Sequence, residues 1–369
     1  MKFVCSKSNL LTGVQTVAKA VPSKTTMSIL ECILIEADNG NIILTANDME
    51  LGIETIIEGN VLVSGKIALD AKIFLEIVRK LPDNDITIET DDNNKTTITC
   101  EKSKFNIIGK SGDDFSCLPI IEKRDPLVIS QYTLKESIRQ TIFSISDNEN
   151  NKLMTGELFE INNDELKVVS LDGHRISIRK IRLKDSYPLK KVVVPGKTLN
   201  EISKILSGDT EKDVLIYISE KHIIFEFDNT TVVSRLIEGE YFKIDQMLSN
   251  DYETKVKINK KELLSCIDRA TLLVKEGDKK PIIINIVDGT MELKINSAVG
   301  SMNEEIDIAK QGKDLMIGFN PKFLIDALRV IEDEEIDIYL VNPKAPCFIR
   351  DEEGKYIYLI LPVNFTTVS

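Results

Sequence analysis

The chain repeats one pattern three times with a period of about 125 residues, and this repetition limits its fold more than any other feature. The landmark in each copy is an apolar, strand-like run that leads directly into a helical pattern. Lys72, Lys197 and Lys322 occupy the same position in the three copies, so successive copies are 125 residues apart. A second helical pattern follows a short strand at the start of each copy, near residues 8, 135 and 261. The sequence therefore predicts three versions of one structural unit.

Each copy reads as a strand, a helix, several strands, a second helix and several more strands. This order predicts an α+β fold in which two helices pack on antiparallel sheets. The pattern breaks near residues 125 and 251, which predicts domains at 1–125, 126–250 and 251–369. Three self-sufficient domains would leave sheet edges open to aggregation, so we expect the sheets to continue across the domain junctions. The helices are expected at residues 7–20, 71–80, 134–144, 197–206, 260–275 and 321–331.

The composition fits a globular protein of two or three domains, because the chain has 369 residues and 42% of them are hydrophobic. No apolar run approaches the roughly 18 residues that a membrane span requires. The N-terminal residues do not resemble a signal peptide, so a cytoplasmic protein without a membrane partner is expected. The six cysteines and two histidines lack the spacing of zinc ligands. We therefore expect six reduced core cysteines and no metal or other cofactor.

The net charge of −12 argues against a nucleic-acid partner, because phosphate binding needs lysine and arginine. The charge is nevertheless segregated. The expected helices hold 15 basic and 6 acidic residues, a net +9, so a total of −12 leaves −21 for the rest of the chain. A basic helix surface on an acidic body predicts contact with the phosphates of a polyanion, independent of base sequence. Any single lysine can equally be a solvated residue of a helix face.

Two motifs imitate catalytic sites but lack essential members. Residues 192–198 resemble the end of a P-loop, yet Lys191 stands where the first glycine of that loop is required. Asp172, His174 and Arg175 could suggest acid–base catalysis, but no activated nucleophile or second carboxylate accompanies them at a meaningful spacing. A hydrolytic or nucleotide-dependent enzyme therefore fits less well than a non-catalytic protein.

Several motifs in a fixed order carry a family resemblance over essentially all 369 residues. They are Met-Lys-Phe at 1–3, Ser-Leu-Asp-Gly-His-Arg-Ile at 170–176, Val-Pro-Gly-Lys at 194–197 and Tyr-Leu-Ile-Leu-Pro-Val at 358–363. With these motifs on a threefold repeat, the chain closely resembles the β subunits of bacterial DNA polymerase III, the sliding clamps. The resemblance implies three DNA-clamp domains per chain and a ring formed by a head-to-tail homodimer, with the helices lining the hole.

The resemblance also implies the function and the partners. It implies a non-catalytic processivity factor that encircles double-stranded DNA without sequence specificity. The ring would tether replicative and repair polymerases. It would bind these polymerases, the clamp loader and repair proteins through their short clamp-binding peptides. A peptide-binding scaffold with the same ring but without DNA is the main alternative, and the charge segregation favours the DNA clamp over it.

Three sets of site residues follow from the resemblance. The DNA contacts would be Lys24, Lys72, Arg79, Lys80, Lys152, Lys197 and Lys204. The peptide pocket would comprise Met154, Leu171, Gly173, His174, Arg175, Ile176, Phe242, Met247, Pro346, Leu359, Leu361, Pro362 and Val363. The dimer interface would comprise Ile77, Lys102, Lys104, Phe105, Leu272, Leu273, Glu304 and Glu305, through pairing of a basic edge at 102–108 with an acidic edge at 302–308. In the pocket wall, Tyr-Phe-Lys-Ile at 241–244 replaces the Phe-Pro-Asp-Tyr of many clamps.

Overall fold

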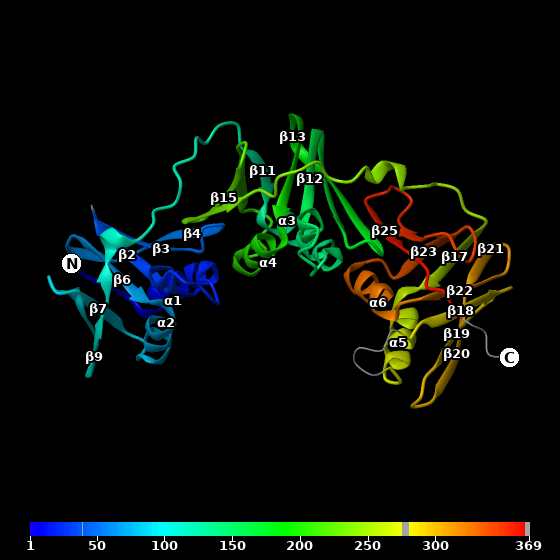
Figure 1. The fold of residues 1–369 in the computed structure, drawn as a ribbon, viewed down its shortest axis with the longest axis horizontal. Helices are drawn as coiled ribbons and strands as arrows, with labels where there is room; N and C mark the ends of the chain where they lie inside the picture. The colour runs from blue at the N-terminus through cyan, green and yellow to red at the C-terminus, as the bar shows by residue number, and fades with distance from the viewer. Residues whose placement is uncertain (39, 275–279, 366–369) are drawn as a thin grey trace. The chain divides into compact units, whose positions relative to one another are not determined.

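The computed structural model describes residues 1–38, 40–274 and 280–365, and Figure 1 shows their helices and strands. The chain divides into two compact units. The first unit is Met1–Leu134 with Glu201–Leu236, and the second unit is Lys135–Asn200 with Ile237–Ser369. Residues of the expected middle domain thus contribute to both units. None of the helices within the described ranges is long and apolar enough to cross a membrane.

The described part of the first unit holds two antiparallel sheets. The five-stranded sheet has the order β5 (Asn60–Val63), β1 (Lys2–Ser6), β7 (Asp85–Thr90), β8 (Lys95–Cys100) and β9 (Ser103–Ile108). The nine-stranded sheet has the order β10 (Lys110–Ser111), β6 (Gly65–Asp70), β2 (Cys32–Asp38), β3 (Asn41–Asn47), β4 (Leu51–Ile57), β16 (Thr230–Arg235), β15 (His222–Phe227), β14 (Asp213–Ile218) and β11 (Leu127–Ser130). The pairing of β4 with β16 continues one sheet from the expected first domain into the expected second domain.

The described part of the second unit also holds two antiparallel sheets. The seven-stranded sheet has the order β12 (Gly156–Leu171), β13 (Arg175–Pro195), β25 (Tyr356–Ile360), β24 (Cys347–Arg350), β23 (Glu335–Leu340), β17 (Thr254–Asn259) and β21 (Ala309–Gly312). The four-stranded sheet has the order β20 (Ser301–Asp307), β19 (Thr290–Asn296), β18 (Ile282–Val287) and β22 (Leu315–Phe319). The pairing of β13 with β25 continues a sheet from the expected second domain into the expected third. Sheet continuity across both junctions is therefore confirmed.

Polar N-cap side chains fix where the helices begin. Ser6, Asp70, Asn259 and Asn320 each accept a hydrogen bond from a backbone N–H of the first helical turn. The α-helices are α1 (Lys7–Val17), α2 (Ala71–Lys80), α3 (Gln131–Arg139), α4 (Gly196–Ile205), α5 (Lys260–Thr271) and α6 (Pro321–Val330). The short 3-10 helices are η1 (Ala18–Ala20), η2 (Ser28–Glu31), η3 (Gly112–Asp114), η4 (Ile142–Ser144), η5 (Lys152–Thr155) and η6 (Ile244–Gln246). The expected helix at 71–80 matches α2 at both ends.

The expected helix at 134–144 was wrong at both ends, because α3 begins at Gln131 and ends at Arg139. After Arg139 the Thr141 hydroxyl donates to the carbonyl oxygen of Ser137 at 2.7 Å, and the Thr141 carbonyl accepts from the Ser170 hydroxyl at 2.6 Å. These side-chain bonds compete with the helical ladder, so the chain continues as a turn and then as η4. The expected helix at 260–275 ends earlier as α5, and its last expected residue, 275, lies outside the described residues.

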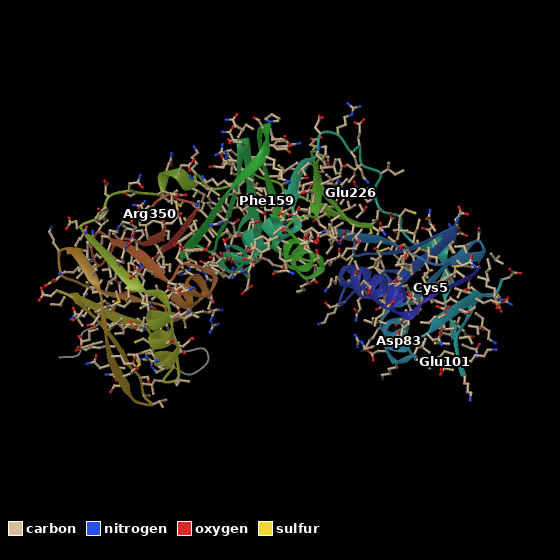
Figure 2. The ribbon with its side chains drawn as sticks, turned by 180° about the vertical axis from the view of Figure 1, so that it is seen from behind. Cys5, Asp83, Glu101, Phe159, Glu226 and Arg350 are labelled. Carbon is tan, nitrogen blue, oxygen red and sulfur yellow. The ribbon has the colours of Figure 1, made fainter. Side chains whose placement is uncertain are left out.

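Apolar side chains from helices and sheets form the core of each unit. In the first unit α1 packs against α2, and Leu10 and Phe74 are fully buried. In the second unit α5 packs against α6, and Phe159 of β12 is fully buried (Figure 2). Burial raises the pKa of the Cys5 thiol to about 12, which keeps it protonated and unreactive. The expectation of six core cysteines was wrong for Cys117, which is exposed in the chain segment after η3.

Candidate DNA and protein interfaces

Basic residues recur at matching positions on α2, α4 and α6. Each helix carries a lysine in its first turn and an arginine or lysine seven residues later, as in Lys72 and Arg79 of α2. Seven residues are about two helical turns, so the two cations lie on the same side of the helix, roughly 10 Å apart. The matching residues of α6, Lys322 and Arg329, are exposed but were missed by the sequence reasoning, although the 125-residue period contains them. The side chains predicted to contact DNA are all exposed, and they are Lys24, Lys72, Arg79, Lys80, Lys152, Lys197 and Lys204.

Several of these cations have an acidic neighbour. Arg79 pairs with Glu76 one turn before it, and Lys204 pairs with Glu201 at 2.8 Å. Such exposed ion pairs contribute only about 0–1 kcal/mol, so these cations remain available to a stronger anion. A phosphate can therefore replace the carboxylate at little cost.

A tight turn between β12 and β13 presents His174. Asp172 Oδ1 accepts hydrogen bonds from the backbone N–H groups of His174 at 2.9 Å and Arg175 at 3.1 Å. Gly173 adopts φ +87°, a conformation that favours glycine. The backbone carbonyl of His174 accepts from the N–H of Leu361 at 2.8 Å, so the turn is joined to the segment after β25. The His174 ring is also 6.0 Å from the Phe323 ring of α6.

Five of the thirteen predicted pocket residues belong to one apolar cluster of the second unit. Leu171, Ile176 and Leu359 are buried in this cluster, and Met154 and Phe242 pack against it while partly exposed. The other apolar positions range from half-buried to exposed, and they are Met247, Pro346, Leu361, Pro362 and Val363. A surface of partly exposed apolar groups with a few fixed polar groups is what binding of a short apolar peptide requires.

Arg175 is buried next to this surface, and only 7% of it is exposed. Its guanidinium donates to Asp172 at 3.0 Å and to Asp326 of α6 at 2.7 Å. It also lies 4.5 Å from the centroid of the Phe323 ring. Arg175 thus joins the turn to α6 and positions Phe323 beside His174. The bond to Asp326 spans 151 positions in sequence, so no local signal could have found it.

The two predicted dimer edges are both terminal strands of their sheets, β9 in the first unit and β20 in the second. Phe105 on β9 is 40% exposed and Leu272 after α5 is 80% exposed. Lys102, Lys104 and Glu305 are exposed, and Ile77 and Leu273 are half-buried. Ile108, which ends β9 and is the last residue of the predicted edge at 102–108, is 85% exposed.

Glu304, which was expected to face the lysines of a second copy, already has a partner. Arg269 of α5 donates to its two carboxylate oxygens at 2.8 and 2.6 Å. These hydrogen bonds hold the pKa of the Glu304 carboxyl below its usual range. Glu305 is therefore the more available acid at this edge.

The strand orders contain two series that recur three times. The first series is β1-β7-β8-β9, β11-β14-β15-β16 and β17-β23-β24-β25. The second series is β6-β2-β3-β4 in one copy and β22-β18-β19-β20 in another. The remaining copy is formed by β12 and β13, and it ends at the N-terminal part of β13. Both junctions within the described residues join the end of a first series to the end of a second series, as β16 with β4 and β25 with β13. Among the terminal strands of the described sheets, β9 ends a copy of the first series and β20 ends a copy of the second, so these two edges are the same two kinds of series end.

Three copies of one α+β module joined through their sheet edges define the DNA-clamp class of protein. Comparison with protein families gives the same answer. The chain matches the N-terminal, central and C-terminal domains of the DNA polymerase III beta subunit at residues 1–119, 128–243 and 245–364. The chain belongs to the DNA polymerase III beta subunit family, the beta sliding clamps, and its function is that of a DNA sliding clamp, a processivity factor.

Individual relatives match along nearly their full length. A beta sliding clamp of Staphylococcus aureus strain Mu50 is 33% identical over 375 residues, which cover 99% of both chains. The crystal structure of a putative DNA polymerase III beta subunit from Eubacterium rectale is 73% identical, with a TM-score of 0.96 over 99% of this chain and 100% of that one. The DNA polymerase sliding clamp of Bacillus subtilis is 35% identical, with a TM-score of 0.95 over the same shares.

Proposed function

We propose that two copies of the chain close head to tail into a ring around duplex DNA. The observation that carries this proposal is the recurrence of one junction type. The two junctions within the chain pair the ends of the two strand series, and β9 and β20 are the same two kinds of end with a neighbouring strand on one side only in the described sheets. A second copy would supply β20 to β9, which covers exposed edges and closes the ring. The three domains would then be residues 1–125, 126–250 and 251–369.

The hole of this ring would be basic and would contact DNA through phosphates. The contacts that we assign are Lys24, Lys72, Arg79, Lys80, Lys152, Lys197 and Lys204, to which the repeat adds Lys322 and Arg329. Phosphate contacts hold the ring without sequence specificity and leave it free to slide. The protein would act in the cytoplasm as a tether, without catalysis and without a cofactor.

The apolar surface around Leu171, Ile176 and Leu359 would bind the short peptide motifs of DNA polymerases, the clamp loader and repair proteins. Such motifs pair a glutamine with leucine and phenylalanine, and apolar side chains of this kind need a partly exposed apolar cluster. Met154, Phe242 and the exposed turn at His174 would form its rim.

A loading assay tests the tether directly. A clamp loader and ATP are used to place the protein on nicked circular DNA, and the protein that co-elutes with DNA is measured by gel filtration before and after the circle is cut. We expect retention on the circle and release from the linear DNA, because only a closed ring is held by topology. Equal retention on circular and linear DNA would refute the proposal.

Charge reversal on the helices is expected to weaken this retention. Changing Lys24→Glu together with Lys197→Glu should lower the slope of binding against salt by about 2, since each lost phosphate contact removes about 1. DNA retention at several salt concentrations measures the slope, and binding of the polymerase peptide should stay unchanged. The matched control changes two exposed lysines outside the α-helices, Lys184→Glu and Lys221→Glu. An equal loss of slope in the control would show that only net charge matters.

A charge placed in the apolar cluster is expected to block peptide binding. Met154→Asp should weaken the affinity for a fluorescent peptide with the glutamine-leucine-phenylalanine motif by roughly 10–100-fold, which corresponds to about 1.4–2.8 kcal/mol. Fluorescence anisotropy measures the affinity, and retention on circular DNA should not change. Met27→Asp is the control, because this methionine of the first unit is 46% exposed. Unaltered peptide affinity in Met154→Asp would contradict the assignment of the pocket.

A further inference from the structure

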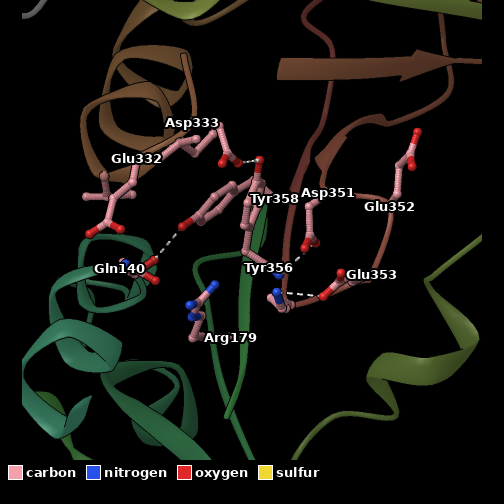
Figure 3. A pocket seen from close by; sticks show the side chains of 12 residues that line it. Gln140, Arg179, Glu332, Asp333, Asp351, Glu352, Glu353, Tyr356 and Tyr358 are labelled. Atoms are coloured by element: carbon pink, nitrogen blue, oxygen red, sulfur yellow. Dashed lines mark hydrogen bonds and ion pairs between the residues drawn. The ribbon is translucent and has the colours of Figure 1, made fainter. Parts of the chain in front are cut away.

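The second unit contains a cavity of about 320 Å³ that shares no lining residue with the peptide pocket. This volume lies at the lower end of the roughly 300–1,000 Å³ of ligand pockets. Two groups of carboxylates face it from opposite sides, Glu332 and Asp333 after α6, and residues 351–353 in the turn between β24 and β25 (Figure 3). Tyr356 and Tyr358 of β25 lie between the two groups. The other lining residues are Gln140, Arg179, Val330, Ile331 and Lys355.

The cavity is strongly anionic. Five carboxylates line it against the two cations of Arg179 and Lys355, a net charge of −3. Most of these carboxylates keep free acceptor capacity, because each can accept about four hydrogen bonds. Glu332 has Arg139 at 3.7 Å, Glu353 has Lys355 at 2.5 Å, and Asp333 accepts from the Tyr356 hydroxyl at 2.7 Å. This charge selects a cation and disfavours an anion.

Gln140 gives an independent indication of a ligand. The residue is only 6% exposed, and its backbone groups are satisfied, since its carbonyl accepts from the Tyr358 hydroxyl at 3.1 Å and its N–H donates to Glu136. Its side-chain carboxamide lines the cavity and has no hydrogen-bond partner within the described ranges. The carboxamide is accessible from the cavity, so a ligand there can hydrogen-bond to it and gain affinity.

We propose that this cavity binds the guanidinium group of an arginine carried by a segment of a partner protein. A guanidinium is planar and has five N–H donors, which match carboxylate oxygens on two sides and the amide oxygen of Gln140 at the base. The tyrosine rings offer it flat apolar faces. Glu332, Glu352 and Glu353 at the rim are exposed, so the main chain of a partner segment can pass over the opening while its arginine enters. An ammonium group has three donors and no plane, and it fits this set of acceptors less well.

Ligand-observed NMR on the full-length protein tests the proposal with N-acetyl-arginine amide as the probe. We expect saturable binding to the wild type. Glu332→Gln with Glu353→Gln should weaken this binding by about tenfold, and so should Gln140→Leu, because each change removes about one charge-assisted or buried hydrogen bond. The matched control, Glu58→Gln with Glu220→Gln, neutralises two exposed carboxylates of the first unit and should bind like the wild type. Equal weakening in the control and the cavity variants, or binding that does not saturate, would overturn the proposal.

Competing cations distinguish the source of the ligand. N-acetyl-lysine amide and spermidine should bind at least several-fold more weakly than the arginine probe. Spermidine that binds as tightly as the arginine probe would refute a partner arginine in favour of a free polyamine. The thermal unfolding midpoint and the affinity for the polymerase peptide verify that Gln140→Leu is folded. If that variant unfolds, the double glutamate variant decides the outcome, because both of its residues are exposed.

Discussion

Replacing Phe105 and Leu272 by aspartate in the same chain is expected to convert the proposed dimer into a monomer of 41.5 kDa at micromolar concentration. Both side chains are exposed in the single chain, 40% for Phe105 and 80% for Leu272. Phe105 lies on β9, and Leu272 follows α5, which packs against β20. Each would bury apolar area against the second copy, worth roughly 1.5–3 kcal/mol. Loss of both contacts, about 3–6 kcal/mol, raises the dimer dissociation constant by roughly 10²–10⁴-fold.

Sedimentation equilibrium measures this change, with the wild type expected at twice 41.5 kDa. The matched control is Leu62→Asp with Val287→Asp, because these side chains are also exposed, at 53% and 39%, and also lie on strands of the two units. The control should remain dimeric. A monomeric wild type would refute ring closure, and a double variant that stays dimeric would place the interface elsewhere.

The 125-residue period predicted most of the helices, because three imperfect copies support one another where a single copy would be ambiguous. The ends of α2 were predicted because the signal is local: Asp70 caps its first turn, and the backbone changes direction directly after Lys80. The end of α3 was not predicted, because it depends on the hydroxyl of Ser170, which is 29 positions from Thr141 in sequence. Contacts between distant segments decide where such a helix ends, and the local sequence pattern does not predict those contacts.

In the candidate sites, too, the sequence predicts the residues that the repeat contains but not those that depend on contacts between distant segments. The repeat contained Lys322 and Arg329, and a stricter use of it would have added them to the basic set. The buried position of Arg175 could not be predicted, since it depends on Asp326. The cavity beside Gln140 is still less visible in the sequence, because its walls come from segments near residues 140, 179, 332 and 353. Only the folded chain brings these segments together.

A second large effect concerns Glu157, a carboxyl buried in the second unit. This residue of β12 is 0% exposed, and neither of its carboxylate oxygens has a hydrogen-bond partner in the part of the chain that the structure describes. Burial raises the pKa of the Glu157 carboxyl from 4.5 to about 8, and the nearby Thr141 hydroxyl offsets only part of this. The folded protein therefore holds a proton on Glu157 at neutral pH, whereas the unfolded chain has lost it.

Glu157→Gln is expected to stabilise the protein increasingly as the pH rises from 4.5 to 8. Between these values the folded state binds one more proton than the unfolded state, so the wild type loses on the order of 4–5 kcal/mol of stability across the window, and this loss is complete above pH 8. Glutamine does not titrate and keeps the shape of the protonated acid. The thermal unfolding midpoint at pH 5, 6.5, 8 and 9 measures the difference, with Glu165→Gln, an exposed glutamate of the same strand, as the control. A constant difference between Glu157→Gln and the wild type at all four pH values would show that this carboxyl is charged in the folded protein.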